Sequence, residues 1–385
     1  MTLKIADRAA VSPFIVMDVM RAANERAAAG GDVLHLEVGQ PGSGAPTGAR
    51  EAAVAAIRQG PLGYTEAAGM SPLRRRIAAH YGQRHGLDLD SARVTVTTGS
   101  SGGFLLAFLA AFDVGDRVAL AAPGYPAYAN ILKALGLEPV WLETGPEHRF
   151  QPTPELLDEV PGKLDGLIVA SPSNPTGTML DDAALGRLAA ACEARGIRLI
   201  SDEIYHGIEF GQRAVTALSH SDSAIVVNSF SKYYGMTGWR VGWLVLPPDM
   251  VRPVERLAQN TFISAPTVSQ HAALAAMDCD DELSGVVAAY GRSRDLLLDA
   301  LPRAGVTRLA PADGAFYIYA DVRHLTDDSP DLCKAMLNEI GVAATPGLDF
   351  DPARGHHYVR FSFAGTEAEI AEAARRLRDW LPTQG

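Results

Sequence analysis

The chain has 385 residues, of which 47% are hydrophobic and 21% charged, a composition typical of a globular protein with room for a large core and a second, smaller one. Its formal net charge of −11 argues against binding to nucleic acid or to an anionic membrane. The three cysteines form no CxxC pair and the ten histidines no HExxH motif, so we expect neither a disulfide framework nor a metal site, and we expect a cytoplasmic protein.

Helix signals stand near the N-terminus. Ser12 followed by Pro13 predicts a helix start, and Gly30-Gly31 predicts its end. Ser71-Pro72 predicts a second helix that ends near Gly86. The longest apolar run, residues 104–112, is about half the length of a membrane span.

Short apolar runs alternate with helical stretches from about residue 93 onward. They are residues 94–96, 118–120, 167–170, 199–200, 225–227 and 241–245. Continuous runs of this kind are typical of strands buried on both faces, so we predict an α/β fold with a mostly parallel sheet sandwiched by helices. We assign residues 45–285 to this large domain. Residues 1–44 and 286–385 would form a smaller α+β domain, with strands at 315–319 and 357–362 and helices near 330–340 and from 367.

Lys232 ends the segment Asn-Ser-Phe-Ser-Lys, directly after the apolar run 224–227, and Arg240 follows eight positions later. Burial or a neighbouring cation lowers the pKa of a lysine, and a neutral amine can form a Schiff base with an aldehyde cofactor. An ordinary loop lysine is the alternative.

A glycine-rich turn, Thr-Thr-Gly-Ser-Ser-Gly-Gly at 97–103, stands between a predicted strand and an apolar helix. The free N–H groups of a helix start can receive a phosphate, with hydroxyls and a cation in support. A plain capped helix is one alternative. The same stretch also fits the G-x-S-x-G elbow of α/β-hydrolases, with Ser101 as nucleophile and Asp313 and His356 as partners, but that interpretation gives Lys232 and Arg240 no task.

Three more polar or aromatic motifs follow predicted strands. Residues 171–177 (Ser-Pro-Ser-Asn-Pro-Thr-Gly) form a rigid turn around Asn174, and Asp202 ends an apolar run. Tyr125 could stack on a flat ligand. A carboxylate facing a pyridine nitrogen would keep that nitrogen protonated. The alternatives are a generic turn for residues 171–177, a helix cap for Asp202 and core packing for Tyr125.

In combination these motifs resemble the class I/II aminotransferases, which are fold type I pyridoxal-phosphate enzymes. The resemblance covers nearly the whole chain and rests on residues 171–177, Asp202-Glu-x-Tyr205, Ser229-Phe-Ser-Lys232 with Arg240, and Arg360-Phe-Ser-Phe. It implies pyridoxal 5′-phosphate as cofactor and two half-reactions, in which an L-amino acid gives its nitrogen to the cofactor and a 2-oxo acid, 2-oxoglutarate or pyruvate, takes it up.

The resemblance also implies a role for each residue. Lys232 forms the internal aldimine and then carries the proton, while Asp202 pairs with the pyridine nitrogen and Asn174 and Tyr205 bind the ring oxygen. Tyr125 and Ile204 cover the two ring faces. The phosphate is bound by Ser100, Ser101, Gly102, Ser229, Ser231 and Arg240, and the substrate carboxylate by Gly39, Asn174 and Arg360. Pro123 and Pro175 match positions that are usually cis.

A homodimer with shared sites is implied as well, with Tyr64 and Ser264 reaching the site of the partner chain. The chain departs from the family at Gly39-Gln-Pro-Gly42, where two acids are missing. Asn260 stands where one group of aspartate aminotransferases has an arginine, which weakens an aspartate assignment. The donor therefore stays open among alanine-, aspartate- and aromatic-like amino acids, and a C–S β-lyase of the same fold stays open as an alternative.

Overall fold

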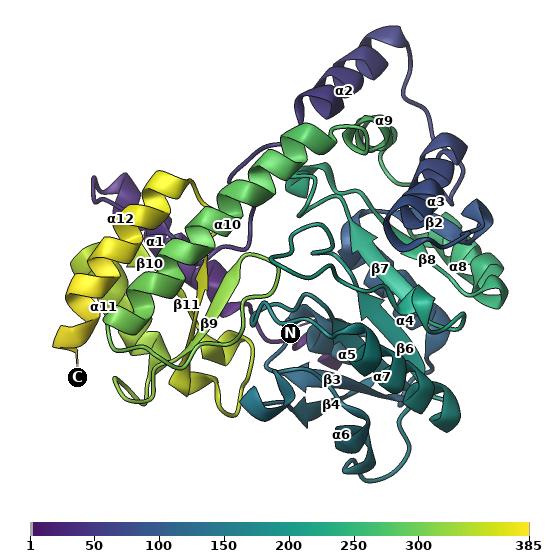
Figure 1. Ribbon diagram of the computed structural model, residues 1–385. Helices are drawn as coiled ribbons and strands as arrows, with labels where there is room; N and C mark the ends of the chain where they lie inside the picture. Colours follow the sequence, from purple (N-terminus) through teal and green to yellow (C-terminus); the bar gives the residue numbers. More distant parts are fainter. Residues whose placement is uncertain (1–2, 385) are drawn as a thin grey trace.

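The computed structural model describes residues 3–384, and its centre is a seven-stranded sheet (Figure 1). Strand β8 runs in the direction opposite to the other six strands, which confirms the predicted mostly parallel sheet. The order in space is β2 (Val94–Thr97), β8 (Gly242–Val245), β7 (Ile225–Ser229), β6 (Arg198–Asp202), β5 (Gly166–Ala170), β3 (Arg117–Ala122) and β4 (Glu138–Glu143). Sequence analysis missed β4, an edge strand in which Pro139 is tolerated because one side needs no N–H donor.

Helices cover both faces of this sheet, as the continuous apolar runs predict. Successive side chains of a strand point to opposite faces, so Val226 packs into one core while Ile225 and Val227 pack into the other. The first core is closed by α2 (Thr47–Gln59), α3 (Ser71–His85), α6 (Pro154–Asp158), α7 (Asp182–Arg195) and α9 (Thr267–Ala276). The second is closed by α4 (Gly99–Ala111), α5 (Ala127–Ala134) and α8 (Pro248–Thr261).

A smaller α+β part, green to yellow in Figure 1, surrounds a third core. Its sheet has the order β11 (Thr345–Pro346), β12 (Tyr358–Ser362) and β9 (Tyr317–Asp321), and α11 (Ser329–Ile340) and α12 (Glu367–Trp380) pack with it. From the N-terminal segment, β1 (Leu34–His35) pairs in parallel with β10 (Val342–Ala343). The domain boundary at 285 stays a prediction, and α10 (Asp280–Arg303) runs across it as one continuous helix.

The predicted start of the first helix is wrong by two residues. Helix α1 spans Ile15–Ala28, and its cap comes from Asp349, whose carboxylate accepts hydrogen bonds from the backbone N–H of Ile15 (2.7 Å) and of Val16 (3.3 Å). The carbonyl of Ser12 instead accepts a bond from Asn130 (3.0 Å). A tertiary contact therefore sets the N-terminus of this helix. The second helix has the predicted bounds, since α3 starts at Ser71 and Gly86 caps it in the left-handed conformation.

The carboxyl ends of the parallel strands meet at one edge of the sheet, where open α/β sheets bind ligands. The segments that follow β2, β3, β5, β6 and β7 carry the motifs singled out above. The expected cis bonds before Pro123 and Pro175 are present, together with a third before Pro172. Within residues 3–384 no helix combines the length and the apolarity needed to cross a membrane.

Candidate active site

A cavity of about 410 Å³ opens at this edge of the sheet. Its lining brings together most of the predicted site residues, namely Gly39, Ser100, Ser101, Tyr125, Asn174, Asp202, Ile204, Tyr205, Ser231, Lys232, Arg240 and Arg360. Gly102, Ser229, Tyr64 and Ser264 lie outside the lining. Residues from every part of the sequence thus converge on one place.

Lys232 follows β7 and extends its amine into the cavity, where Nζ donates a hydrogen bond to the carbonyl oxygen of Gly39 (2.6 Å). Burial and the nearby guanidinium of Arg360 lower the pKa of Lys232 to about 8, against the opposing effect of Asp202. A far larger fraction of this amine is therefore neutral at physiological pH than in an ordinary lysine. A neutral amine is the form that attacks a carbonyl carbon.

Asp202 ends β6 and is the one acid that lines this cavity within the described residues. Its carboxylate accepts a hydrogen bond from the backbone N–H of Ile204 (3.1 Å) and another from the hydroxyl of Tyr128. Burial raises the pKa of Asp202 to about 6, while these hydrogen bonds and Lys232 oppose the rise. Sequence analysis missed Tyr128; its spacing of three residues from Tyr125 at a helix start is the signal that places both on one side.

The first turn of α4 and Arg240 form a positively polarised end of the cavity. The guanidinium lies so close to Gly99 that a Cβ there would stand 2.5 Å from Nη2, and Arg240 itself adopts a left-handed φ of 51°. The positive end of a helix and a nearby cation repel each other, and an anion bound between them offsets this repulsion. Ser100 and Ser101 are on the same turn, so this end is suited to a phosphate.

Ser229 and Gly102 support this end from behind. The hydroxyl of Ser229 lies 2.8 Å from that of Ser231 and donates to the carbonyl of Val241 (3.1 Å), so Ser229 fixes the position of Ser231. Gly102 has no room for a side chain, because a Cβ would lie 2.3 Å from the hydroxyl of Thr98.

Arg360 comes from β12 and is buried. Its Nη1 donates to Oδ1 of Asn174 (2.8 Å), Nη2 donates to the carbonyl of Glu37, and the guanidinium lies 4.4 Å from the centre of the Tyr317 ring. Its Nε has no hydrogen-bond partner among the described residues. A buried charged donor without a partner is costly, so Arg360 is suited to an anionic ligand such as a carboxylate.

Tyr317 is a second cavity residue that sequence analysis missed. Its hydroxyl lies 2.7 Å from that of Tyr205, and a Cβ on Gly39 would collide with it at 1.9 Å. The glycine at position 39 therefore allows the N-terminal segment to approach both Tyr317 and Lys232. The run Ala-Phe-Tyr at 315–317 predicted only a strand, because a tyrosine in a buried strand is most often part of the hydrophobic core.

Tyr64 and Ser264 lie in neighbouring segments away from the cavity lining. Nε2 of Gln270 donates both to the hydroxyl of Thr65 (3.0 Å) and to the carbonyl of Ala265 (2.9 Å), which ties the two segments together. The side chain of Tyr64 is 82% exposed. The structure thus holds the segments of these two residues together, and neither residue lines the cavity of this chain.

The hydrolase alternative finds no support in this geometry. Ser101 lines the cavity, but Asp313 and His356 do not. Asp313 instead pairs with Arg149 (2.6 Å) in a different cleft. Ser101 therefore lacks the two partners, Asp313 and His356, that this interpretation requires.

The donor set of the cavity fits pyridoxal phosphate. It combines an anion-binding end, a tyrosine ring, a buried carboxylate, a lysine amine with a lowered pKa and a buried arginine with an unpaired Nε. These are the partners that a phosphate, a flat ring, a pyridine nitrogen, an aldehyde and a substrate carboxylate would need.

Comparison with known proteins agrees with this chemistry. The family model described as aminotransferase class I and II matches residues 31–377. Valine–pyruvate aminotransferase of Mycobacterium tuberculosis is 52% identical, with all of both chains covered. The crystal structure of an aminotransferase from M. tuberculosis superposes with a TM-score of 0.98 at 52% identity over all of both chains. That of a putative aminotransferase from Silicibacter pomeroyi gives 0.94 at 56% identity over 99% of this chain and 100% of that one.

A family model that matches most of the chain and a full-length relative at 52% identity settle the family. The cavity supplies the groups that the chemistry of this family needs. The chain belongs to the class I and II aminotransferases and is a pyridoxal-phosphate-dependent enzyme that moves an amino group between an amino acid and a 2-oxo acid.

Proposed function

We propose that the enzyme uses a small aliphatic amino acid, with valine as the reference donor and pyruvate as the acceptor. One observation carries this proposal. The arginines that line the cavity within the described residues are Arg240 and Arg360, and both have a task, at the phosphate and at the substrate carboxylate. The remaining wall near α1 is apolar and consists of Phe14, Val16, Met17, Met20 and Ile131. The activity named for the M. tuberculosis relative supports the same substrates.

The roles of the site residues are part of the proposal. Bound pyridoxal phosphate supplies an electron sink for the substrate Cα. Lys232 would hold this group through Nζ, and its neutral amine would accept the proton from the substrate Cα. Asp202 stabilises the protonated pyridine nitrogen, Asn174 and Tyr205 donate to the ring oxygen, and Tyr125 and Ile204 hold the ring between them. Ser100, Ser101, Gly102, Ser229, Ser231 and Arg240 form the phosphate site, and Gly39, Asn174 and Arg360 orient the substrate carboxylate.

A donor panel tests the substrate class. We expect the second-order rate constant of the first half-reaction to be at least about 10²-fold higher for valine than for aspartate, because an unpaired carboxylate against an apolar wall costs several kcal/mol. The measurement is the conversion of the cofactor to its pyridoxamine form, with valine, alanine, aspartate and phenylalanine as donors. Equal rates for valine and aspartate would refute the aliphatic assignment. Release of pyruvate and ammonia from a sulfur amino acid would favour the β-lyase.

Met17 offers a matched pair of variants for the same question, since it lines the cavity and is 51% exposed. Met17→Arg places a cation beside the apolar wall and should raise the rate with aspartate relative to valine. Met17→Gln has a similar size without the charge and should leave the ratio near that of the native enzyme.

We also propose a homodimer in which Tyr64 and Ser264 complete the site of the partner subunit, in a cytoplasmic enzyme. The surface around Tyr64 supports the dimer, because exposed apolar side chains gather on α2 and the adjoining segments: Val54, Ile57, Leu62 and Ile263. An exposed apolar cluster of this kind is typical of an interface.

Mixing two variants tests this sharing. Tyr64→Ala should weaken cofactor binding by about 10–10²-fold, because a hydrogen bond to a charged group contributes about 1.5–3 kcal/mol. Hybrid dimers of Tyr64→Ala with Lys232→Ala chains should recover activity at low cofactor concentration, since one of their two sites has both native residues. Leu62→Ala chains, mixed in the same way, serve as the control for interface damage. A monomer by light scattering, or hybrids that bind cofactor no better than Tyr64→Ala alone, would contradict the proposal.

A further inference from the structure

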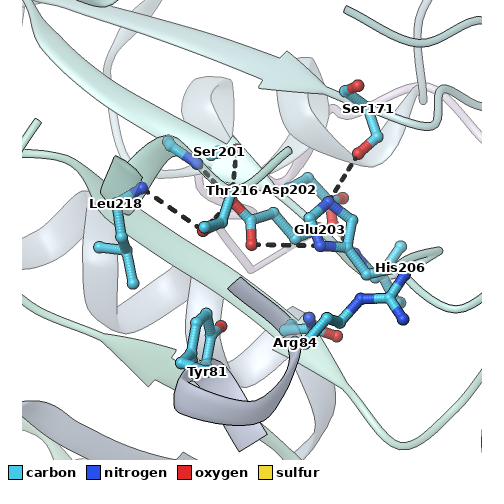
Figure 2. Close-up of polar contacts among 12 residues, drawn as sticks. Tyr81, Arg84, Ser171, Ser201, Asp202, Glu203, His206, Thr216 and Leu218 are labelled. Carbon is cyan, nitrogen blue, oxygen red and sulfur yellow. Dashed lines mark hydrogen bonds and ion pairs between the residues drawn. The ribbon is translucent and has the colours of Figure 1, made fainter. Parts of the chain in front are cut away.

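Next in the chain to Asp202, which lines the cavity, stands a fully buried carboxyl group, that of Glu203 (Figure 2). Glu203 follows Asp202, and its backbone N–H continues the pairing with β7 by donating to Val227 (2.8 Å). Its Oε1 accepts three hydrogen bonds, from the hydroxyls of Ser201 (3.1 Å) and Thr216 (2.9 Å) and from the backbone N–H of Ala217 (2.9 Å). This oxygen is saturated with donors.

The other oxygen, Oε2, accepts no hydrogen bond from the described residues, and Nδ1 of His206 lies 3.5 Å from it. His206 is buried as well, and its Nε2 lies 3.1 Å from the carbonyl oxygen of Ser171. A carbonyl oxygen only accepts, so Nε2 carries a proton. In a neutral ring Nδ1 is then an acceptor, and two acceptors face each other unless one proton lies between Oε2 and Nδ1.

The surroundings decide which group holds that proton. Burial raises the pKa of Glu203 to about 8, with a small further rise from Asp202, and burial lowers the pKa of His206 well below its usual range. The titratable and charged groups that face the pair from α3 are His80, Tyr81, Arg84 and His85. Burial and Arg84 lower the pKa of both His80 and His85 to about 4, so both rings are neutral at physiological pH. Arg84 pairs with Glu209 (2.5 Å). The protonated partner is therefore the carboxyl group.

We propose that Glu203 is a neutral carboxylic acid whose Oε2–H donates to Nδ1 of His206, and that this pair positions Asp202 and Asn174 from behind. The link is direct: Glu203 adjoins Asp202 in the chain, and His206 bonds Ser171 at the start of the turn that carries Asn174. The positioning part rests on the cofactor roles proposed for these two residues. The proton assignment does not depend on those roles, since it rests on the contacts of Oε2 and of the His206 ring and on the burial of both groups.

Glu203→Gln tests the proton assignment, because glutamine keeps the oxygen that accepts three donors and places an NH₂ donor opposite Nδ1. In the infrared spectrum, native minus Glu203→Gln should show the carbonyl band of a protonated carboxylic acid at pH 7. As the pH rises through about 8 this band should give way to carboxylate bands. Glu159→Gln, an exposed position, should show no such band. Carboxylate bands alone at pH 7 would overturn the assignment, whatever substrate the enzyme uses.

His206→Leu tests the positioning, because leucine can neither accept from Glu203 nor donate to Ser171. We expect a shift in the pH midpoint of the cofactor absorbance and a fall in kcat of about 10–10²-fold, since misplaced groups lose catalytic geometry. Glu203→Gln keeps an acceptor at Oε1 and a donor opposite Nδ1, so it should change the midpoint and kcat less than His206→Leu does. A folded His206→Leu enzyme with the native midpoint would refute the positioning role, whereas an unexpected donor preference would refute only the proposed substrate.

Discussion

Replacing Lys232 by alanine is expected to lower the rate of transamination by about 10²–10⁴-fold, the range that a general base typically contributes. Lys232 is the lysine that lines the cavity within the described part of the chain, and its lowered pKa makes the neutral amine available. The measurement is a single-turnover assay with valine. Borohydride reduction followed by peptide mass spectrometry should show the cofactor bound to residue 232 in the native enzyme and to no residue in the variant.

Lys232→Arg is the matched variant, because a guanidinium keeps the positive charge but does not give up its proton. If the charge alone mattered, this variant would stay active; we expect it to be as slow as Lys232→Ala. Cofactor trapped on a different lysine of the native enzyme would show that the proposed role of Lys232 is wrong.

Replacing Arg360 by glutamine is expected to lower kcat/KM for valine by about 10²–10⁴-fold. The loss corresponds to two charge-assisted hydrogen bonds to the substrate carboxylate, at about 1.5–3 kcal/mol each. Cofactor absorbance should stay near that of the native enzyme, because Arg360 lies at the opposite end of the cavity from the phosphate residues in our proposal. Steady-state kinetics with valine gives the measurement.

A substrate without a carboxylate provides the control for this variant. The amine 2-amino-3-methylbutane has the side chain of valine but nothing for Arg360 to bind, so native enzyme and Arg360→Gln should convert it at similar slow rates. A variant that loses activity equally with valine and with this amine would show that Arg360 acts on the fold and not on the substrate.

Local signals in the sequence predicted most of the large sheet and of the cavity. Apolar runs marked six strands of the central sheet within a residue or two of their observed bounds. Each motif at a strand end, such as Asp202 or residues 171–177, could then be assigned to one edge because parallel strands end on the same side. Strand β4 escaped because its residues carry charges and a proline, which an edge position tolerates.

Other features depend on residues that are far apart in the sequence. The cap of α1 comes from Asp349, more than 300 positions away, and the hydroxyl bonded to Asp202 comes from Tyr128. The sequence shows that Glu203 follows Asp202. The three groups that donate hydrogen bonds to its carboxyl oxygen, and the histidine that faces the other oxygen, could not be inferred from sequence spacing.

By itself, then, the sequence determined most of the segments that form strands and helices and the reactive side chains that stand at the strand ends, because hydrophobic periodicity and turn chemistry act over a few residues. Only the tertiary structure decided the protonation of these groups and their partners. Burial and neighbouring charges set the pKa values of Lys232, Asp202 and Glu203, and both depend on how distant segments pack together.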